Sequence, residues 1–355
     1  MSGSVRLDVA DQVVLVIGDG PGLPAQVHAL IQAGADVHVC TATPTTSLDD
    51  VVQRGLARAV TDPDLSAYDL VLTCRDRTDS ATLAGGATGT ADGSVIGEVI
   101  LVGGGPGDPN LLTLAAIQEL RAADVVVYDR LAPLSALTEA PESAVLVDVG
   151  KIPRGRHTSQ ERINDILVEH ALAGRRVVRF KGGDNFVFGR GGEEALACAA
   201  AGIPVRVVPG VSSAIAGPGL AGIPVTHREL TQGVTIVTGH VPPGHQASTV
   251  NWRGLAQSGT TLVIMMGVHA LPAIAEELLA VGMPAHTPAA TIADAALPTM
   301  RVVRAPLDGI AQAVAEQGLG APAVTVVGEV AGLDVLAGIV ACPGDNLAET
   351  DGVTA

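Results

Sequence analysis

The sequence predicts an α/β protein in which Val-rich, mostly parallel strands are covered by Ala-rich helices. Hydrophobic residues make up 47% of the chain but aromatic residues only 2%, so the cores must be built from Val, Leu, Ile and Ala. The 43 glycines fit the many turns that such layers require. A length of 355 residues predicts two or three domains rather than one.

The first segment has the pattern of a βαβ unit. We expect a strand at residues 13–17, a helix at 25–33 and a second strand at 36–40, with a Gly-rich turn at 18–22 after the first strand. A further strand is expected at 69–73. Residues 78–94 are rich in Gly, Thr, Ala and Ser, which is typical of a linker.

After this linker the alternation of strands and helices starts again. Helices are expected at residues 112–122 and 159–172. Strands are expected at residues 99–103, 125–128, 144–149, 176–180, 205–208, 234–238, 261–265, 289–293 and 323–327. Nine strands are too many for one ordinary sheet. We therefore expect two linked α/β halves that separate near residues 210–222.

Charge and composition narrow the classes of function. The formal charge of −16 argues against nucleic-acid binding, which needs clustered Lys and Arg. The four cysteines form no CxxC pair, and His227, His240 and His245 lack the close spacing of zinc ligands, so we expect no metal. No apolar run reaches the ~18 residues that a membrane span needs, and the N-terminus does not resemble a signal peptide. We expect a cytoplasmic protein without a membrane partner.

Three loops that follow strands carry the chemical signal. Ligands of open α/β sheets bind beyond the carboxyl ends of the strands. The loop at residues 103–109 is rich in Gly and Pro, and it fits a plain tight turn equally well. The loop at 181–194 holds five glycines and two phenylalanines, which a solvated turn does not explain. The third signal comprises residues 209–214 and 222–228.

These motifs carry a family resemblance. GGGPGDPNLLTL, VVVYDRL, VGK, RVVRFKGGDNFVFGRGGEE, VPGVSSAIAGPGLAGIPVTHR, VTGH and MMG occur in this order over about residues 97–335. The segment resembles the uroporphyrinogen-III C-methyltransferases, which belong to the tetrapyrrole methylases. The resemblance implies a tetrapyrrole methylase fold of two α/β halves with a cofactor cleft between them, preceded by a small Rossmann-like βαβ domain. The domains implied are a truncated Rossmann-like domain (1–80), a linker (81–96), two methylase halves (97–212 and 213–340) and a disordered tail (341–355).

The resemblance also implies roles for individual residues. S-adenosylmethionine, which leaves as S-adenosylhomocysteine, would contact Pro106, Gly182, Gly183, Asp184, Val187, Ser212, Ser213, Met266 and the backbone near Ala295. The catalytic residues would be Asp129 as proton acceptor, Lys151 as proton donor, and Arg190 and Glu193 in substrate handling. Arg130, Arg190, Arg228 and His240 would bind the substrate, uroporphyrinogen III.

Alternatives stay open for several of these residues. Asp129 could be a cap after a strand, and Lys151 could anchor a substrate carboxylate instead of donating a proton. Arg154 and Arg156 suit either substrate carboxylates or ordinary surface ion pairs. Two positions depart from the family pattern. Asn185 replaces the usual Pro, which should loosen its loop, and Ala295 replaces a frequent Gly, which should matter little.

The N-terminal segment resembles the start of the dehydrogenase and ferrochelatase module of siroheme synthase. Gly18 and Gly20 fit the NAD-binding turn, but Pro21 and Pro24 stand where the helix begins, and no acidic residue ends the second strand. We expect a degenerate remnant and a methyltransferase that acts as a homodimer. The alternatives are a multifunctional siroheme synthase, a methylase of a later precorrin, and a non-catalytic tetrapyrrole carrier.

Overall fold

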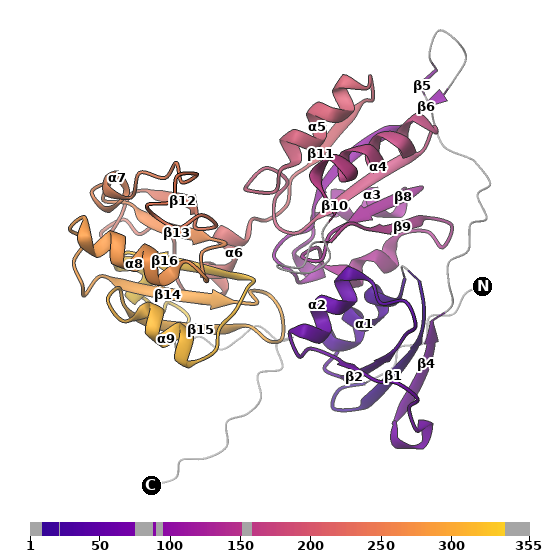
Figure 1. Cartoon of the computed structure of the whole chain (residues 1–355), viewed down its shortest axis with the longest axis horizontal. Helices are drawn as coiled ribbons and strands as arrows, with labels where there is room; N and C mark the ends of the chain where they lie inside the picture. The colour runs from indigo at the N-terminus through magenta and orange to yellow at the C-terminus, as the bar shows by residue number, and fades with distance from the viewer. Residues whose placement is uncertain (1–8, 21, 75–87, 90–94, 151–157, 338–355) are drawn as a thin grey trace. The chain divides into compact units, whose positions relative to one another are not determined.

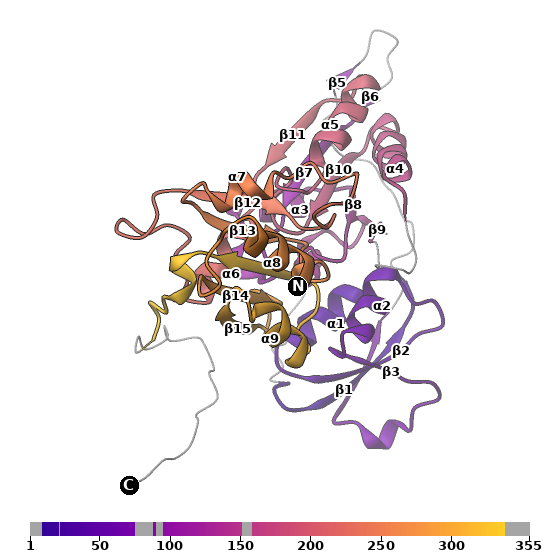
Figure 2. The same cartoon turned by 60° about the vertical axis from the view of Figure 1, so that its left-hand side comes forward.

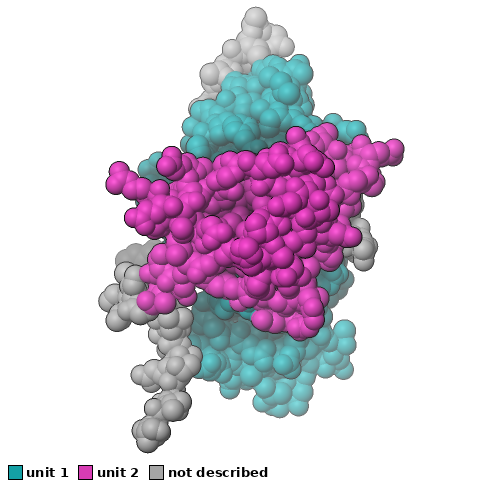
Figure 3. Space-filling model, turned by 90° about the vertical axis from the view of Figure 1, so that its left-hand side faces the viewer, with its two compact units in different colours: residues 1–217, 293–301, 321–323 teal, residues 218–292, 302–320, 324–355 magenta. Residues whose placement is uncertain are grey.

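A computed structural model describes residues 9–20, 22–74, 88–89, 95–150 and 158–337. Its packing divides the chain into two compact units, coloured separately in Figure 3. Unit 1 comprises residues 1–217, 293–301 and 321–323, and unit 2 comprises the rest. Most of the expected linker (81–87 and 90–94) and the expected tail (341–355) lie outside the described residues. The domain boundaries expected from the sequence stay predictions.

The N-terminal part of unit 1 is a small parallel sheet. Its strand order is β3-β2-β1-β4, with β1 (Val13–Gly18), β2 (Asp36–Cys40), β3 (Arg58–Ala59) and β4 (Leu70–Cys74). Helices α1 (Leu23–Gln32) and α2 (Thr46–Gln53) bury their apolar residues against the same side of the sheet (Figure 1). The Rossmann-like arrangement is thereby confirmed. A short turn, η1 (Leu65–Ala67), precedes β4.

Helix α2 was not expected from the sequence. It begins at Thr46 because the Thr45 hydroxyl accepts a hydrogen bond from the Leu48 amide at 3.3 Å. Leu48 and Val51 are its buried apolar residues, and the helix is only eight residues long. Three apolar residues in so short a segment, only two of them buried, give little periodic signal.

His28 makes the stability of this region depend on pH. Burial, followed by the charge of Arg54, lowers the pKa of His28 from 6.5 to about 4. Between these values the unfolded chain binds a proton that the folded chain excludes, so the free energy of unfolding falls as the pH falls. We expect a loss of about 2 kcal/mol from this group between pH 7 and pH 5.

Urea unfolding of the wild type and of His28→Gln at the two pH values measures this effect. The variant should show a smaller change with pH, because glutamine does not titrate. An equal change in both proteins would contradict the assignment to His28.

The next sheet in unit 1 is entirely parallel, in the order β11-β7-β10-β8-β9. Its strands are β7 (Glu98–Gly103), β8 (Val125–Tyr128), β9 (Val145–Asp148), β10 (Arg176–Lys181) and β11 (Val205–Val208). The short strands β5 (Thr88–Gly89) and β6 (Val95–Ile96) pair antiparallel to each other before it. The carboxyl ends of the five parallel strands all lie at one edge of the sheet.

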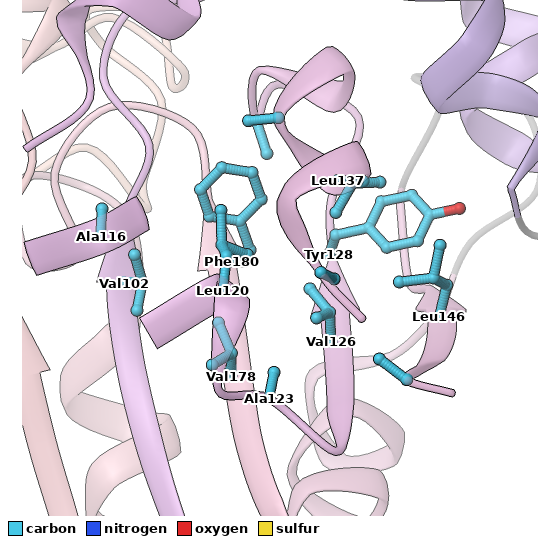
Figure 4. Packing of buried hydrophobic residues seen from close by; sticks show 14 of the residues in the cluster. Val102, Ala116, Leu120, Ala123, Val126, Tyr128, Leu137, Leu146, Val178 and Phe180 are labelled. Carbon is cyan, nitrogen blue, oxygen red and sulfur yellow. The ribbon is translucent and has the colours of Figure 1, made fainter. Parts of the chain in front are cut away.

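Helices cover both faces of this sheet, as Figures 1 and 2 show. One face packs on α3 (Leu114–Arg121) and the turn η3 (Leu134–Glu139). In Figure 4 the side chains of Tyr128 and Phe180 stand among Leu120, Leu137 and Val178 in this layer. The other face packs on α4 (Gln160–Leu172) and α5 (Gly191–Ala200).

Helix α1, which covers the N-terminal sheet, also packs against η3 on one face of the second sheet. Ala25 belongs to the same buried apolar cluster as Leu134 and Leu137 of η3. The Ser135 hydroxyl donates a hydrogen bond to the Gln32 side chain at 2.6 Å. The Gln32 amide in turn donates to the Gly107 carbonyl at 3.2 Å. The N-terminal part of unit 1 therefore shares its packing with the second sheet.

Unit 2 is built on the strand order β12-β13-β16-β14-β15. Its elements are β12 (Val234–Thr238), α7 (Trp252–Ala256), β13 (Thr261–Met265), α8 (Leu271–Ala280), β14 (Pro288–Ala293), β15 (Arg301–Pro306), α9 (Ile310–Glu316), β16 (Ala323–Val327) and the turn η4 (Glu329–Gly332). Strands β12 and β13 are parallel, whereas β13 and β16 are antiparallel. This sheet is therefore mixed, which the sequence did not indicate.

The expected fold class is confirmed, and every expected strand is present with ends that differ by at most one residue. The helix expected at 112–122 begins later. A short turn, η2 (Pro109–Leu111), comes first, and Thr113 then caps α3 through the Ala116 amide. Strand β15 was missed, because Val303 is its only buried residue. Within the described ranges, no helix is long and apolar enough to cross a membrane.

Candidate functional site

The Gly-rich loops that follow β7, β10 and β11 meet at the carboxyl edge of the parallel sheet. Gly105 and Gly183 exchange backbone hydrogen bonds of 3.1 and 2.6 Å. A Cβ added to Gly210 would lie 2.3 Å from the Gly183 carbonyl oxygen and 2.5 Å from the Gly103 carbonyl carbon. Only glycine permits backbones to approach this closely. Three loops that are far apart in the sequence therefore form one layer of main chain.

The open side of this layer lies near Ser213. A Cβ built on Gly183 would meet nothing closer than the Ser213 Oγ, at 3.7 Å, and Gly183 has a φ of +68°. At the first loop, a Cβ added to Gly107 would lie 3.5 Å from the Ala295 carbonyl oxygen. Gly183, Ser213 and Ala295, all expected at the cofactor, thus lie against these loops. Main-chain polar groups and small side chains of this kind suit a ligand held by the backbone.

The Asp184 carboxylate stabilises the loop after β10 through hydrogen bonds to the backbone. Its Oδ1 accepts hydrogen bonds from the amides of Phe186 and Val187 at 2.9 and 3.1 Å, and its Oδ2 accepts from the Gly210 amide at 3.4 Å. Such bonds from a carboxylate to the backbone two residues on stabilise a tight turn. In this structure the Asp184 carboxylate shapes the loop that was expected to hold the cofactor.

Asn185 does not act as expected from the sequence. We expected a looser loop where Asn replaces Pro. Instead, the fully buried Asn185 amide donates to the carbonyl oxygens of Leu101 and Val208, at 3.2 and 2.8 Å. These carbonyls belong to β7 and β11. The side chain therefore ties the loop to two strands, and each bond contributes about 1 kcal/mol.

Asp129 follows β8 and is held by three donors. Its Oδ1 accepts from the amides of Leu131 and Gly182 at 3.1 and 3.3 Å. Its Oδ2 accepts from Arg179 Nη2 at 3.2 Å. The side chain is 25% exposed. The carboxylate thus caps the turn after β8, which was one interpretation of the sequence, and one of its oxygens also faces a guanidinium.

A buried network of charges adjoins Asp129, and no motif of the sequence indicated it. Arg179 and Lys181 extend from β10, and both contact Glu194 of α5, at 3.0 and 2.9 Å. Burial, reinforced by the charge of Arg179, lowers the pKa of Lys181. For Arg179, burial is outweighed by Glu194 and Asp129, which raise its pKa. Charged residues in the central strand of a sheet covered on both faces were the available signal.

Arg190 and Glu193 form a bidentate ion pair. Arg190 Nε and Nη2 lie 2.8 and 2.6 Å from the two carboxylate oxygens of Glu193. Both side chains are about half exposed. The neighbouring Phe186 and Phe188 are also exposed, at 55% and 40%. Exposed aromatic rings and an exposed Arg in one loop are the kinds of group that bind an organic anion.

Arg130 lies 2.8 Å from the Asp50 carboxylate of α2, and both side chains are largely buried. Asp50 also contacts Arg54, which pairs with Asp294. A residue of the N-terminal part thus holds an arginine that was expected at the substrate. Lys151, Arg154 and Arg156 lie outside the described residues.

The other residues expected at the site lie in further loop positions of the two units. Pro106 is half-buried in the first loop, and the Ser212 hydroxyl accepts a hydrogen bond from the Ala214 amide at 3.3 Å. In unit 2, Met266 is exposed with a φ of +55°, directly after β13. Arg228 and His240 are exposed in loops of the same unit. Their roles stay predictions.

The turn after β1 does not suit a dinucleotide. The Asp19 Oδ1 accepts hydrogen bonds from both Thr41 and Thr43 hydroxyls and from two amides, at 2.7–3.0 Å. The Thr41 bond, followed by those of Thr43, lowers the pKa of Asp19 to about 2. A fixed negative charge stands where a pyrophosphate would bind, and Thr41 follows β2 where an acid would hold the ribose. These residues do not fit NAD.

Across the described residues, no group of three or more His, Cys, Asp or Glu side chains is arranged to hold a metal ion. A cavity of about 220 Å³ in the N-terminal part is lined by residues that include Val39, Pro44 and Leu48. The residues that line this cavity do not belong to the loops after β7, β10 and β11.

Fold and loops together define a class, an α/β protein whose Gly-containing loops meet beyond the carboxyl ends of its parallel strands. Residues 98–311 match the family described as Tetrapyrrole (Corrin/Porphyrin) Methylases, and residues 5–85 match one described as Putative NAD(P)-binding. The chain belongs to the tetrapyrrole methylase family.

Three relatives illustrate this membership. The chain is 48% identical over 241 residues to an S-adenosyl-L-methionine-dependent uroporphyrinogen III methyltransferase of Methanosarcina barkeri, covering 68% of this chain and 94% of that protein. It is 47% identical to a siroheme synthase of Pseudomonas paraeruginosa, covering 70% of this chain and 52% of the synthase. It thus spans about half the length of that synthase. The crystal structure of uroporphyrin-III C-methyl transferase from Thermus thermophilus with S-adenyl homocysteine is 43% identical, with a TM-score of 0.55, covering 66% of this chain and 98% of that one.

Proposed function

We propose that this chain is an S-adenosylmethionine-dependent C-methyltransferase that converts uroporphyrinogen III to precorrin-2 by methylation at carbons 2 and 7. The product would enter siroheme or cobalamin synthesis. The observation that carries the proposal is the layer of main chain formed by the loops at Gly105, Gly183 and Gly210. A relative with this activity aligns along 94% of its own length, which supports the same conclusion.

The cofactor supplies an activated methyl group on a sulfonium. Gly182, Gly183 and Asp184, with Pro106, Val187, Ser212, Ser213, Met266 and Ala295, would hold it. The protein mainly aligns the methyl group with a pyrrole carbon, which suits a rigid backbone layer. The new carbon–carbon bond forms as the carbon–sulfur bond breaks, and the electron pair goes to sulfur.

Methylation leaves a cationic ring system that must lose a proton. We assign Asp129 as the acceptor, because its carboxylate is partly exposed and its position is fixed by three donors. Lys151 is proposed as the proton donor. Arg190 and Glu193 would handle substrate, with Arg130, Arg228 and His240 contacting the tetrapyrrole. An arginine suits the substrate carboxylates because its guanidinium offers parallel donors.

The test is methyl transfer to uroporphyrinogen III, with mass analysis of the product. We expect consumption of S-adenosylmethionine and a product that carries two added methyl groups. No transfer by a folded protein would overturn the proposal and favour a carrier. One methyl group, or transfer only to a later precorrin, would overturn the substrate assignment.

A second candidate is a multifunctional siroheme synthase, which the match of residues 5–85 to an NAD(P)-binding family favours. The geometry at Asp19 argues against it, since its carboxylate would repel the pyrophosphate. We expect NAD to bind with a Kd weaker than about 1 mM by calorimetry. We also expect no sirohydrochlorin absorbance when the protein is incubated with NAD and precorrin-2. Micromolar binding, or rapid oxidation, would establish the synthase instead.

The resemblance further implies a cytoplasmic homodimer. Light scattering of the purified chain measures its mass in solution, and a mass near twice 35.7 kDa is expected. A monomer at assay concentration would contradict the prediction of a dimer.

A further inference from the structure

We propose that Arg179, locked by Glu194, is a positioning residue for Asp129 in the methyl-transfer reaction. The inference rests on the proposed function and deepens it. Neither residue was assigned a role from the sequence or from the family resemblance. Both are buried in unit 1, directly behind the expected proton acceptor.

The guanidinium of Arg179 is held at every nitrogen. Nε donates to Glu194 Oε1 at 3.0 Å, and Nη1 donates to the carbonyl oxygens of Val127 and Phe180 at 3.2 and 3.0 Å. Nη2 donates to Asp129 Oδ2 at 3.2 Å. A planar group with three bonded nitrogens has one orientation, so the direction of Nη2 is set by the other two.

Glu194 is fixed in turn by its own donors. Lys181 Nζ lies 3.0 and 2.9 Å from its two carboxylate oxygens, and the Gln160 amide donates to Oε1 at 3.3 Å. Glu194 itself is fully buried. The chain of contacts therefore runs from helices α4 and α5, through Arg179 of β10, to the carboxylate after β8.

The two oxygens of Asp129 are used unequally. Oδ1 accepts two backbone amides, whereas Oδ2 accepts only Arg179 among the described residues. A carboxylate oxygen can accept about two hydrogen bonds, so Oδ2 keeps capacity for a further proton. With the side chain 25% exposed, Oδ2 is the oxygen that takes the proton from the methylated ring. Arg179 sets where this oxygen lies.

Two matched variants test the inference. Arg179→Gln and Lys181→Gln each remove one cation from Glu194, but only the first removes a donor from Asp129. We expect Arg179→Gln to lower kcat by about 10- to 100-fold, the range of a misplaced proton acceptor, with the KM for S-adenosylmethionine within about twofold. Lys181→Gln should keep kcat within about threefold, because Glu194 keeps its hydrogen bonds from Gln160 and Arg179. Arg179→Lys, which keeps the charge, should recover part of the lost kcat.

Thermal unfolding and binding of S-adenosylhomocysteine are measured for every variant, so that a damaged fold is recognised. If Arg179→Gln does not fold, Arg179→Lys carries the test through its own fall in kcat at unchanged KM. Equal losses in the Arg179→Gln and Lys181→Gln variants, or a kcat of Arg179→Gln within threefold of the wild type, would overturn the positioning role. Where only Arg179→Lys folds, a kcat of that variant within threefold of the wild type would overturn it. The wild type is assayed first. Its failure to transfer a methyl group would instead overturn the proposed function, and this inference with it.

Discussion

Replacing Glu194 with glutamine is expected to lower the free energy of unfolding by about 3–5 kcal/mol, since it leaves buried Lys181 without a carboxylate partner and Arg179 with only that of Asp129. Arg179 and Lys181 are each only 4% exposed in their side chains and would share one neutral amide. Glutamine has nearly the shape of glutamate, so packing is preserved and the loss reports the charge. Urea unfolding at pH 7.5 measures it.

Glu193→Gln is the matched control. Glu193 is the preceding residue of the same helix and also pairs with an arginine, but its side chain is 52% exposed. Exposed ion pairs contribute about 0–1 kcal/mol, so this change should scarcely alter the free energy of unfolding. A loss below about 1 kcal/mol for Glu194→Gln, equal to that of the control, would show that the buried network is not a stabilising unit.

The second large effect is expected from Gly210→Ala, which should weaken S-adenosylhomocysteine binding at least ~10-fold. The added Cβ would lie 2.3 Å from the Gly183 oxygen and 2.5 Å from the Gly103 carbon, and both are backbone atoms. Backbone cannot rotate away as a side chain can, so the loop after β11 must move away from Gly103 and Gly183. Calorimetry with S-adenosylhomocysteine measures the change in affinity.

Gly192→Ala provides the comparison for this prediction. A Cβ at Gly192 meets nothing within 4 Å, and the residue lies in the first turn of α5. Alanine should leave binding unchanged and stabilise the helix by about 0.5–1 kcal/mol. Wild-type affinity in Gly210→Ala would mean that the close approach of the three loops is not needed for the ligand.

Much of the fold was predictable because its strands are continuous Val-rich runs. Buried parallel strands such as β7 and β8 have this pattern, and their carboxyl ends must share one edge. The meeting of the loops at Gly103, Gly183 and Gly210 followed from that geometry. Strand β15 could not be predicted in the same way, since a partly exposed strand with one buried valine lacks such a run.

The site was harder to predict where its contacts are non-local. Arg130 pairs with Asp50, 80 residues earlier, and no local pattern links the two. Glu193 and Glu194 are adjacent acids that the sequence does not distinguish, yet Glu194 is fully buried while Glu193 is exposed. Only the position of α5 over β10 separates their roles. The contacts of Asn185 are also non-local, because its side-chain amide donates hydrogen bonds to carbonyl oxygens of two strands, β7 and β11.

The packing of helix α1 affects how the protein unfolds. Ala25 lies in the apolar cluster of Leu134 and Leu137, and Gln32 bonds to Ser135 and to the Gly107 carbonyl. Domains that share a core lose stability together, because opening one exposes the buried surface of the other. The first eighty residues and the sheet that follows them should therefore melt as one cooperative block. A truncation that begins after the linker would leave the cluster around η3 open to solvent and prone to aggregation.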